Sequence, residues 1–573
     1  MVKSTKNICR VLFFSGVLLV TSACSDSFLQ TDSPNQPSQT TYWQTESDAL
    51  MALTACYDAM QSQNLYDDNI DGWKFGFLGR ETSTDNGDHT WGDWMLGSSI
   101  SKCASSTTDE CFSMYWNANY EVIKRCNMLV ENVERIPMEA EKIDAYKAEA
   151  IALRALMYCN LTSVFRDVPY LTKPLTLAEA QAPKAERSQI ISSLLEDLKT
   201  WIPKIPVIGK AQKGRMSQEA GYAIMGRIAL FNQRWDEAIT AYKNVVGKVQ
   251  LFKSGDGTDY AANYADLFKE QNETAAEVLL SVHFKGPGLG EGSCFGVCWS
   301  APMNAIEGSM NLCDDFYCID GLPIDKSPLF KGSLVQGAHT KANPDMGRYE
   351  NRDPRMKQTF LMPGTDYISP QDGALTCPPQ FTIRPETRTG YKLWKYMAET
   401  SVPSDKDVYD YHIIRYPEVL LILAEATYEK DGAISDDILN KTINVIRSRK
   451  GVEMPPLTNA FVKGNGLDMR MEIRRERTIE LAFEGFRRDD LRRWKTAETE
   501  LIGAIKGIKL KGSEYENLDV LNEGNPGLTD ENGFLIVEPA ENRNFVTPKH
   551  YYYSLPLDEL YLNPNLAPNN PGW

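Results

Sequence analysis

The chain lacks the sequence patterns that mark the common classes of enzyme. No nucleophile elbow, H-E-x-x-H helix or phosphate-binding loop is present. A glycoside hydrolase needs two carboxylates at a fixed separation, but 77 acidic residues make some such pair inevitable and therefore uninformative. The five histidines are scattered without the spacing of metal ligands, at His89, His283, His339, His412 and His550. These absences predict a protein that is not an enzyme and needs no cofactor; a surface glycoside hydrolase is the weaker alternative.

The chain also lacks an apolar run long enough to cross a membrane. Its longest candidate, Val11 to Val20, covers roughly half of a 30 Å hydrocarbon core, whereas a spanning helix needs about 20 apolar residues. Three basic residues precede this run, and three small residues follow it, directly before Cys24. This order predicts a secretory signal peptide over residues 1–23. Small residues before a cysteine resemble a bacterial lipobox, which predicts lipidation of Cys24; ordinary secretion with an incidental cysteine is the alternative.

Positive charge is scarce. The chain has 61 Lys and Arg against 77 Asp and Glu, a formal net charge of −16, and the three basic residues of the signal peptide are lost on cleavage. A surface of this sign repels nucleic acid, so no nucleic-acid partner is expected.

Zinc-type cysteine spacing is missing as well. Two loose pairs, Cys294 with Cys298 and Cys313 with Cys318, are more widely spaced than the C-x₂-C pairs of a zinc ribbon. Disulfides and free thiols both remain open for the ten cysteines other than Cys9 and Cys24. Calcium binding cannot be read from the sequence, and the metal content is left unknown.

Amphipathic helices dominate what is present. Thr45 and Asp48 form an approximate capping box ahead of apolar residues spaced three and four apart. The same spacing predicts helices over about 115–136, 139–165 and 190–202. Before them, residues 24–41 form the lipidated N-terminus and a polar tether that contains Pro34 and Pro37. The rest of the chain, 42–573, is expected to form one domain.

A tetratricopeptide-like unit is the clearest repeat. Residues 226–242 alternate small and bulky side chains across a tight helix-turn-helix, and Trp235 and Tyr242 are expected in its core. A second helical pair is expected over 417–429 and 435–449. Stacked pairs of this kind build a curved scaffold, here over about 42–250 and 410–500. Between them, about 251–402 is rich in Gly and Pro, with β-prone runs at 278–284 and 316–319.

Several separated motifs share the order of motifs in one known family. They are Ser27-Phe28-Leu29 with Pro34, Tyr42-Trp43, Leu153-Arg154-Ala155, Arg352-Asp353-Pro354-Arg355, Arg415-Tyr416-Pro417-Glu418, the charged segment from Glu472 to Trp494, and Asn570-Pro571-Gly572-Trp573. Together they resemble the SusD/RagB family of outer-membrane nutrient-binding lipoproteins over essentially the whole chain.

The resemblance implies a fold, a location and a role. The fold is mainly α: a tetratricopeptide-like helical scaffold with inserted loops and a few short strands. The protein would be lipid-anchored on the outer-membrane surface, where it binds an oligosaccharide or polysaccharide. It would deliver this glycan to a SusC-like TonB-dependent transporter; capture of oligopeptides by the same architecture is the alternative.

The charged segment after Glu472 invites a structural interpretation. On a helix, Glu472 and Glu476 lie one turn apart, Glu480 and Glu484 continue the row, and Arg477 can reach Glu480. Arg forks suit partly buried carboxylates, so we predict Arg–carboxylate pairing within and between packed helices.

The ligand site is predicted from composition, independently of the resemblance. A sugar ring needs flat apolar faces and polar groups for its hydroxyls in a concave site. Residues 80–94 supply both within one expected loop, and a second Gly-rich loop adds Trp299. The alternative is that Trp91 or Trp94 packs against the scaffold. The predicted ligand-binding residues are Trp91, Trp94, Trp299, Arg80, Asp85 and Asn86.

Overall fold

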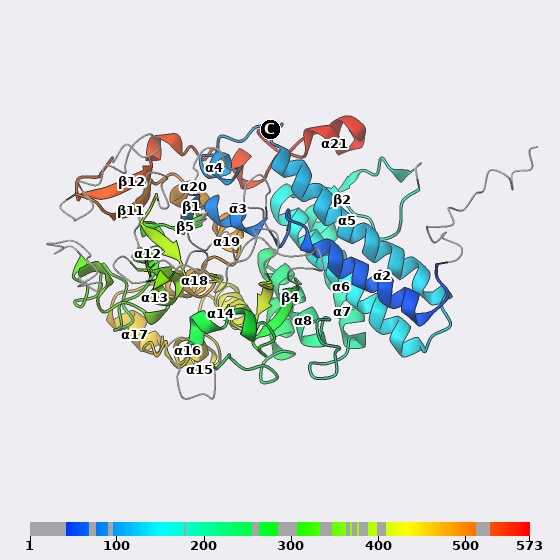
Figure 1. Ribbon diagram of the computed structural model, residues 1–573, viewed down its shortest axis with the longest axis horizontal. Coiled ribbons are helices and arrows are strands. Elements are labelled where there is room, and N and C mark those ends of the chain that lie inside the picture. The colour runs from blue at the N-terminus through cyan, green and yellow to red at the C-terminus, as the bar shows by residue number, and fades with distance from the viewer. Residues whose placement is uncertain are drawn as a thin grey trace, which may run out of the picture.

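The computed structural model describes residues 42–67, 76–89, 96–176, 179–254, 263–284, 306–332, 347–362, 388–397, 408–511 and 528–573. It adds the backbone of the short paired strands β7 (Tyr367–Ile368) and β8 (Leu375–Thr376). Long helices gather on one side of the molecule, and short helices and strands on the other (Figure 1). No helix of the described residues is long and apolar enough to cross a membrane. The fold is thus mainly α with a few short strands, as the sequence predicts.

The helical side follows the apolar periodicity of the sequence. The capping box is confirmed: Thr45 N–H donates to Asp48 Oδ2 at 2.7 Å, and the Thr45 hydroxyl accepts from Asp48 N–H. Helix α6 (Ala140–Phe165) is buried along most of its second half. It is the central helix of this side, because other long helices pack around it. The helices on this side are α2 (Glu46–Asp58), α5 (Glu110–Asn132), α6 (Ala140–Phe165), α7 (Arg187–Trp201), α8 (Gln218–Phe231) and α9 (Trp235–Lys243).

Helices α8 and α9 form the predicted repeat unit. Gly226 faces Ala241 where the two helices pack, and a Cβ added to Gly226 would lie in ordinary van der Waals contact with Ala241 Cβ, at 3.5 Å. Tyr242 is buried in the core, and Trp235 is partly buried and packs against it, which confirms their structural reading. The next pair begins with α14 (Tyr416–Asp431), which ends at Gly432 with φ +66°.

One predicted helix is wrong in its continuity. The segment expected to be helical over 435–449 is two short helices, α15 (Asp436–Lys441) and α16 (Ile443–Arg447). They are separated at Thr442, whose φ of −128° and ψ of −98° are not helical. Its hydroxyl donates back to the Ile438 carbonyl at 2.6 Å, a bond that competes with the helical pattern.

Short antiparallel strands join distant parts of the chain. Strand β4 (Val278–Val282), predicted from its apolar run, pairs with β10 (Tyr411–Arg415). The expected strand at 316–319 is wrong, because only Cys318 makes a single bridge, to Arg352. A four-stranded sheet has the order β1 (Gly87–His89), β5 (Ile306–Gly308), β9 (Tyr391–Leu393) and β6 (Phe360–Leu361). Two further pairs are β2 (Val168–Pro169) with β3 (Lys184–Ala185), and β11 (Ile505–Lys509) with β12 (Phe534–Glu538).

The remaining helices are short, and most of them lie on the side of the molecule opposite the long helices (Figure 1). They are α3 (Phe77–Thr82), α4 (Leu96–Ser101), α10 (Asn263–Asp266), α12 (Met310–Asp315), α13 (Pro354–Thr359), α17 (Asn459–Gly464), α18 (Met469–Glu480), α19 (Arg487–Arg493), α20 (Ala497–Glu500) and α21 (Leu557–Leu562). In Figure 1, α21 lies beside α5, so the C-terminal segment returns to the helical side.

A buried network of charges connects α13, α18, β10 and the residue before β4. Arg415 donates to Glu484 through Nε at 2.6 Å and to Glu277 through Nη1 at 2.7 Å. Arg355 donates to Glu476 at 2.8 Å and to Glu480 at 3.1 Å. All six side chains are almost completely buried, so the predicted Arg–carboxylate pairing is confirmed.

Two details of that prediction are wrong. Helix α18 ends at Glu480, so Glu484 belongs to the turn that follows. Arg477 pairs with Asp490 at 2.7 Å and not with Glu480, whose carboxylate is occupied by Arg355 and Arg415.

The described cysteines are free thiols, namely Cys56, Cys103, Cys111, Cys126, Cys159, Cys313 and Cys318.

Candidate functional site

A groove of about 630 Å³ lies between the end of α2 and the middle of α5. It is lined by the turn after α2, by the exposed side of α5 and by Phe284, which lies two residues after the end of β4. The volume lies within the range of about 300–1,000 Å³ found for small-molecule sites. We call this cavity the α2–α5 groove.

Four amide side chains are among the polar groups of the α2–α5 groove, beside the carboxylates of Asp58, Asp67 and Glu121. Gln61, Gln63, Asn64 and Asn117 all line it. Gln61 Nε2 donates to the His283 carbonyl at 2.6 Å, which ties the groove wall to the β4 segment. The side-chain Oδ1 of Asn64 is buried and, within the described part of the chain, has no hydrogen-bond partner. A buried acceptor left without a donor costs about 1–3 kcal/mol, so a ligand hydroxyl that reaches it would be stabilising.

A charged clamp closes one end of the groove. Arg125 donates to Asp58 Oδ2 at 2.7 Å and to Glu121 Oε1 at 2.9 Å. Its Nη1 also donates to the Ala55 carbonyl at 2.8 Å, which fixes the end of α2 against α5. Partial burial raises the pKa of Glu121, but Arg125 and Lys124 together outweigh it and hold that pKa below its usual value.

The aromatic part of the predicted ligand site cannot be placed. Trp91, Trp94 and Trp299 lie outside the described residues, as does the predicted lipidation site Cys24. In sequence, Phe284 of the groove wall is the last described residue before the segment that carries Trp299.

The polar part of the predicted site is described, and it lies in the interior. Residues 80–89 are not the single open loop that the sequence suggests, because α3 and β1 occupy most of them. Arg80 is 7% exposed and donates from Nη2 to the Leu65 carbonyl at 2.9 Å. Asp85 forms an ion pair with Arg487, and Asn86 Nδ2 donates to Glu81 at 3.4 Å. A ligand would have to replace these contacts to reach the three side chains.

Sequence reasoning did not single out the amide groups of the α2–α5 groove. The signal was present as the polar run Gln61-Ser62-Gln63-Asn64 directly after a helix. A polar run after a helix is also typical of an ordinary turn, and its partners on α5 lie about fifty residues further along the chain. Only the tertiary fold brings Asn117 to the same groove.

The described residues contain no group of three His, Cys, Asp or Glu side chains arranged to hold a metal ion. Burial lowers the pKa of His89 and His412 to about 3, and that of His550 to about 4. These three imidazoles are therefore neutral at pH 7, and none of them lines the groove.

The fold defines a class: a helical-repeat scaffold with inserted strands, here with a groove between α2 and α5. A model of the SusD family matches residues 252–573, and one described as starch-binding associating with outer membrane matches residues 27–230. The first match alone covers more than half of the chain. The protein belongs to the SusD family.

Curated relatives support this assignment. SusD-like protein P2 of Formosa agariphila is 23% identical, and the alignment covers 98% of this chain and 99% of that protein. SusD-like protein P25 of the same organism is 26% identical over 286 residues, which span half of that protein's length.

Solved structures share the fold. A SusD-like carbohydrate binding protein from Bacteroides fragilis is 26% identical. Its superposition has a TM-score of 0.75 and covers 92% of this chain and all of that one. A laminarin binding SusD-like protein is similar in fold, with a TM-score of 0.61 and 22% identity over 93% of this chain.

Proposed function

We propose that this protein is a cell-surface lipoprotein that binds an oligosaccharide or polysaccharide in the α2–α5 groove. In this proposal it passes the glycan to a SusC-like TonB-dependent transporter and catalyses nothing. Support comes from the family membership, from the match to a family model described as starch-binding, and from a structural neighbour described as laminarin binding. The observation that carries the choice of site is the presence of four amide side chains in a groove of about 630 Å³.

The chemistry of the groove suits a sugar. Each amide offers both donors and an acceptor, and a pyranose carries hydroxyls that do the same. Gln63, Asn64 and Asn117 therefore match a ligand that is polar but uncharged. Arg125 is already paired with Asp58 and Glu121, so the described residues of the groove offer no unpaired cation to an anionic ligand. We also propose that Trp91, Trp94 and Trp299 stack on the apolar faces of the glycan.

A glycan array is the direct test. The full-length chain, purified in detergent, is applied to immobilised polysaccharides, and the supernatant is assayed for released reducing ends. We expect retention on at least one glycan without release of product. Retention only on an oligopeptide library would contradict the glycan proposal, and release of reducing ends would contradict the non-catalytic one.

The location is tested separately. Replacing Cys24 with Ala should remove fatty-acid label and move the protein out of the outer-membrane fraction, because acyl chains contribute about 0.8 kcal/mol per buried CH₂. Crosslinking of the unaltered protein in intact cells should recover a large β-barrel protein. Crosslinks to periplasmic proteins alone would contradict the transporter partnership.

A further inference from the structure

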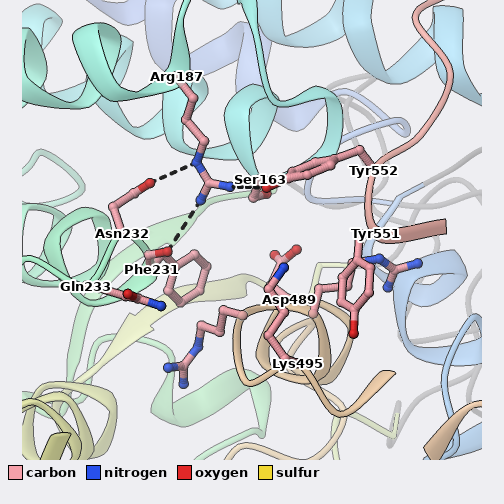
Figure 2. A pocket seen from close by; sticks show the side chains of 11 residues that line it. Ser163, Arg187, Phe231, Asn232, Gln233, Asp489, Lys495, Tyr551 and Tyr552 are labelled. Carbon is pink, nitrogen blue, oxygen red and sulfur yellow. Dashed lines mark hydrogen bonds between the residues drawn. The ribbon is translucent and has the colours of Figure 1, made fainter. Parts of the chain in front are cut away.

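A second cavity, of about 210 Å³, lies apart from the α2–α5 groove and carries cations on its walls. It forms where the start of α7, the turn after α8, helix α19 and the C-terminal segment meet (Figure 2). Its charged lining residues are Arg187, Asp489, Arg492, Arg493 and Lys495. We call this cavity the α7–α19 pocket.

Three of its cations make no ion pair within the described part of the chain. The Arg187 guanidinium donates to neutral oxygens: Asn232 Oδ1 at 2.8 Å, the Tyr552 hydroxyl at 3.1 Å and the Phe231 carbonyl at 3.3 Å. Figure 2 shows it with these partners. Arg492 is 7% exposed and donates to the carbonyls of His550 and Arg488. Lys495 is exposed at the pocket mouth.

The other two charged residues are already neutralised. Arg493 pairs with Glu425 and with Asp490, and the Asp489 carboxylate pairs with Arg488. The three unpaired cations therefore give the pocket a local positive charge, although the whole chain is strongly acidic. Burial and then repulsion from Arg488 lower the pKa of Arg492 to about 10, and the nearby Asp489 does not offset them.

Two of the three aromatic rings that line the pocket, those of Tyr551 and Phe231, lie against cations. Lys495 Nζ lies 4.1 Å from the centroid of the Tyr551 ring. The Arg493 guanidinium lies 5.5 Å from the centroid of the Phe231 ring. Both rings are thus engaged in cation–π contacts, and recognition in this pocket depends on charge.

We propose that the α7–α19 pocket binds the oxyanion of a small ligand, a carboxylate or a sulfate ester carried on a single sugar-sized unit. Guanidinium groups bind such oxyanions with paired, charge-assisted hydrogen bonds, and a lysine adds a point charge. The cavity has room for about seven waters at roughly 30 Å³ each, which admits one such unit and not a chain of them. The pocket is separate from the α2–α5 groove, and this proposal does not depend on glycan binding in that groove.

The test uses calorimetric titration of the full-length chain in detergent with sodium glucuronate, galactose 6-sulfate, inorganic sulfate and glucose. We expect glucuronate or one of the sulfates to bind, and we expect no glucose binding that depends on the cations of this pocket. Which anion binds distinguishes the carboxylate from the sulfate source. Binding should weaken as salt rises, because ions screen charged contacts at a partly open site.

Variants locate the binding. Lys495→Gln should weaken anion binding about tenfold, the equivalent of one charge-assisted hydrogen bond at about 1.4 kcal/mol. Arg187→Gln should do the same, and thermal unfolding checks that it folds. Lys463→Gln, which removes an equal charge from exposed α17, is the matched control and should leave binding unchanged. No anion binding, or binding that is unaffected by Lys495→Gln in a folded protein, would overturn the proposal.

Discussion

Arg487 and Asp85 are 402 positions apart in the chain and meet in a two-point ion pair. Arg487 Nε donates to Asp85 Oδ1 at 2.9 Å, and Nη2 donates to Oδ2 at 2.6 Å. Both side chains are about nine-tenths buried. The pair fastens the segment between α3 and β1 to α19, so the polar loop residues that the sequence suggests for ligand contact also connect distant parts of the fold.

Replacing Arg487 with Met should destabilise the protein by about 3–5 kcal/mol, because it leaves the Asp85 carboxylate buried without its partner. Urea unfolding of variant and parent measures the difference. Asp437→Asn, which breaks the exposed Lys441–Asp437 pair, is the control and should change stability little. An equal effect of the two substitutions would contradict the buried role of Arg487.

The same pair predicts a pH dependence. Burial raises the pKa of Asp85, but Arg487 outweighs it and leaves the pKa below its usual value. A depressed carboxyl pKa stabilises the folded state above the unfolded pKa of about 3.9, and this stabilisation is lost as pH falls through the folded value. In Asp85→Asn the loss of stability below about pH 4 should therefore be smaller than in the parent.

Glu81 should act in the opposite direction. It is fully buried, and burial raises its pKa to about 7, although hydrogen bonds from Gly485 N–H and Asn86 lower it in part. The folded state thus favours the protonated form, and stability falls as pH rises from about 4.5 through 7. The penalty at pH 8 is of order 3 kcal/mol, at about 1.36 kcal/mol per pKa unit.

Glu81→Gln tests this. Gln carries no charge, so the variant should lack the decrease in stability that the parent shows between pH 5 and pH 8. Its amide can be accommodated, because the buried Asn86 carbonyl oxygen has no partner in the described structure and can accept a hydrogen bond if the Asn86 amide turns over. Thermal unfolding across this pH range gives the measurement, and parallel curves for variant and parent would contradict the raised pKa.

The sequence predicts the helical scaffold well because apolar spacing is a local property. The capping box at Thr45, the bounds of α6 and the α8–α9 repeat all follow from residues within one or two turns of each other. The break at Thr442 was missed because a single hydroxyl bond to Ile438 decides it. The Arg–carboxylate pairing of the charged segment was predictable in kind, but not in its partners.

Long-range contacts explain what the sequence could not show. The burial of Asp85 depends on Arg487, and that of Glu81 on the Gly485 N–H; both partners lie about four hundred positions away. Composition makes residues 80–89 resemble an open polar loop, because it does not reveal these partners. The α2–α5 groove was missed for the same reason, since Asn117 comes from another helix.

Amide truncation in the α2–α5 groove should weaken glycan binding without unfolding the protein. Asn117 is exposed on α5, so Asn117→Ala removes ligand hydrogen bonds and little else. A net loss of about 0.5–1.5 kcal/mol corresponds to roughly a two- to twelvefold weaker affinity. Thr200→Ala on exposed α7 is the control. Unchanged affinity of Asn117→Ala for the glycan found on the array would remove this part of the groove from the site.

The tryptophan variants decide between stacking on a glycan and packing in the core. A tryptophan that stacks on a sugar loses contact energy when it is truncated yet leaves the fold intact, whereas a buried one costs about 3–5 kcal/mol of stability as Trp→Ala. For Trp91→Ala, Trp94→Ala and Trp299→Ala we expect weaker glycan binding with an unfolding temperature close to that of the parent. Trp116→Ala is the matched control: Trp116 is 4% exposed and packs edge-on against Phe165, so its loss should lower the unfolding temperature markedly. Any of the three variants that binds as tightly as the parent, or melts as low as Trp116→Ala, removes that tryptophan from the ligand site.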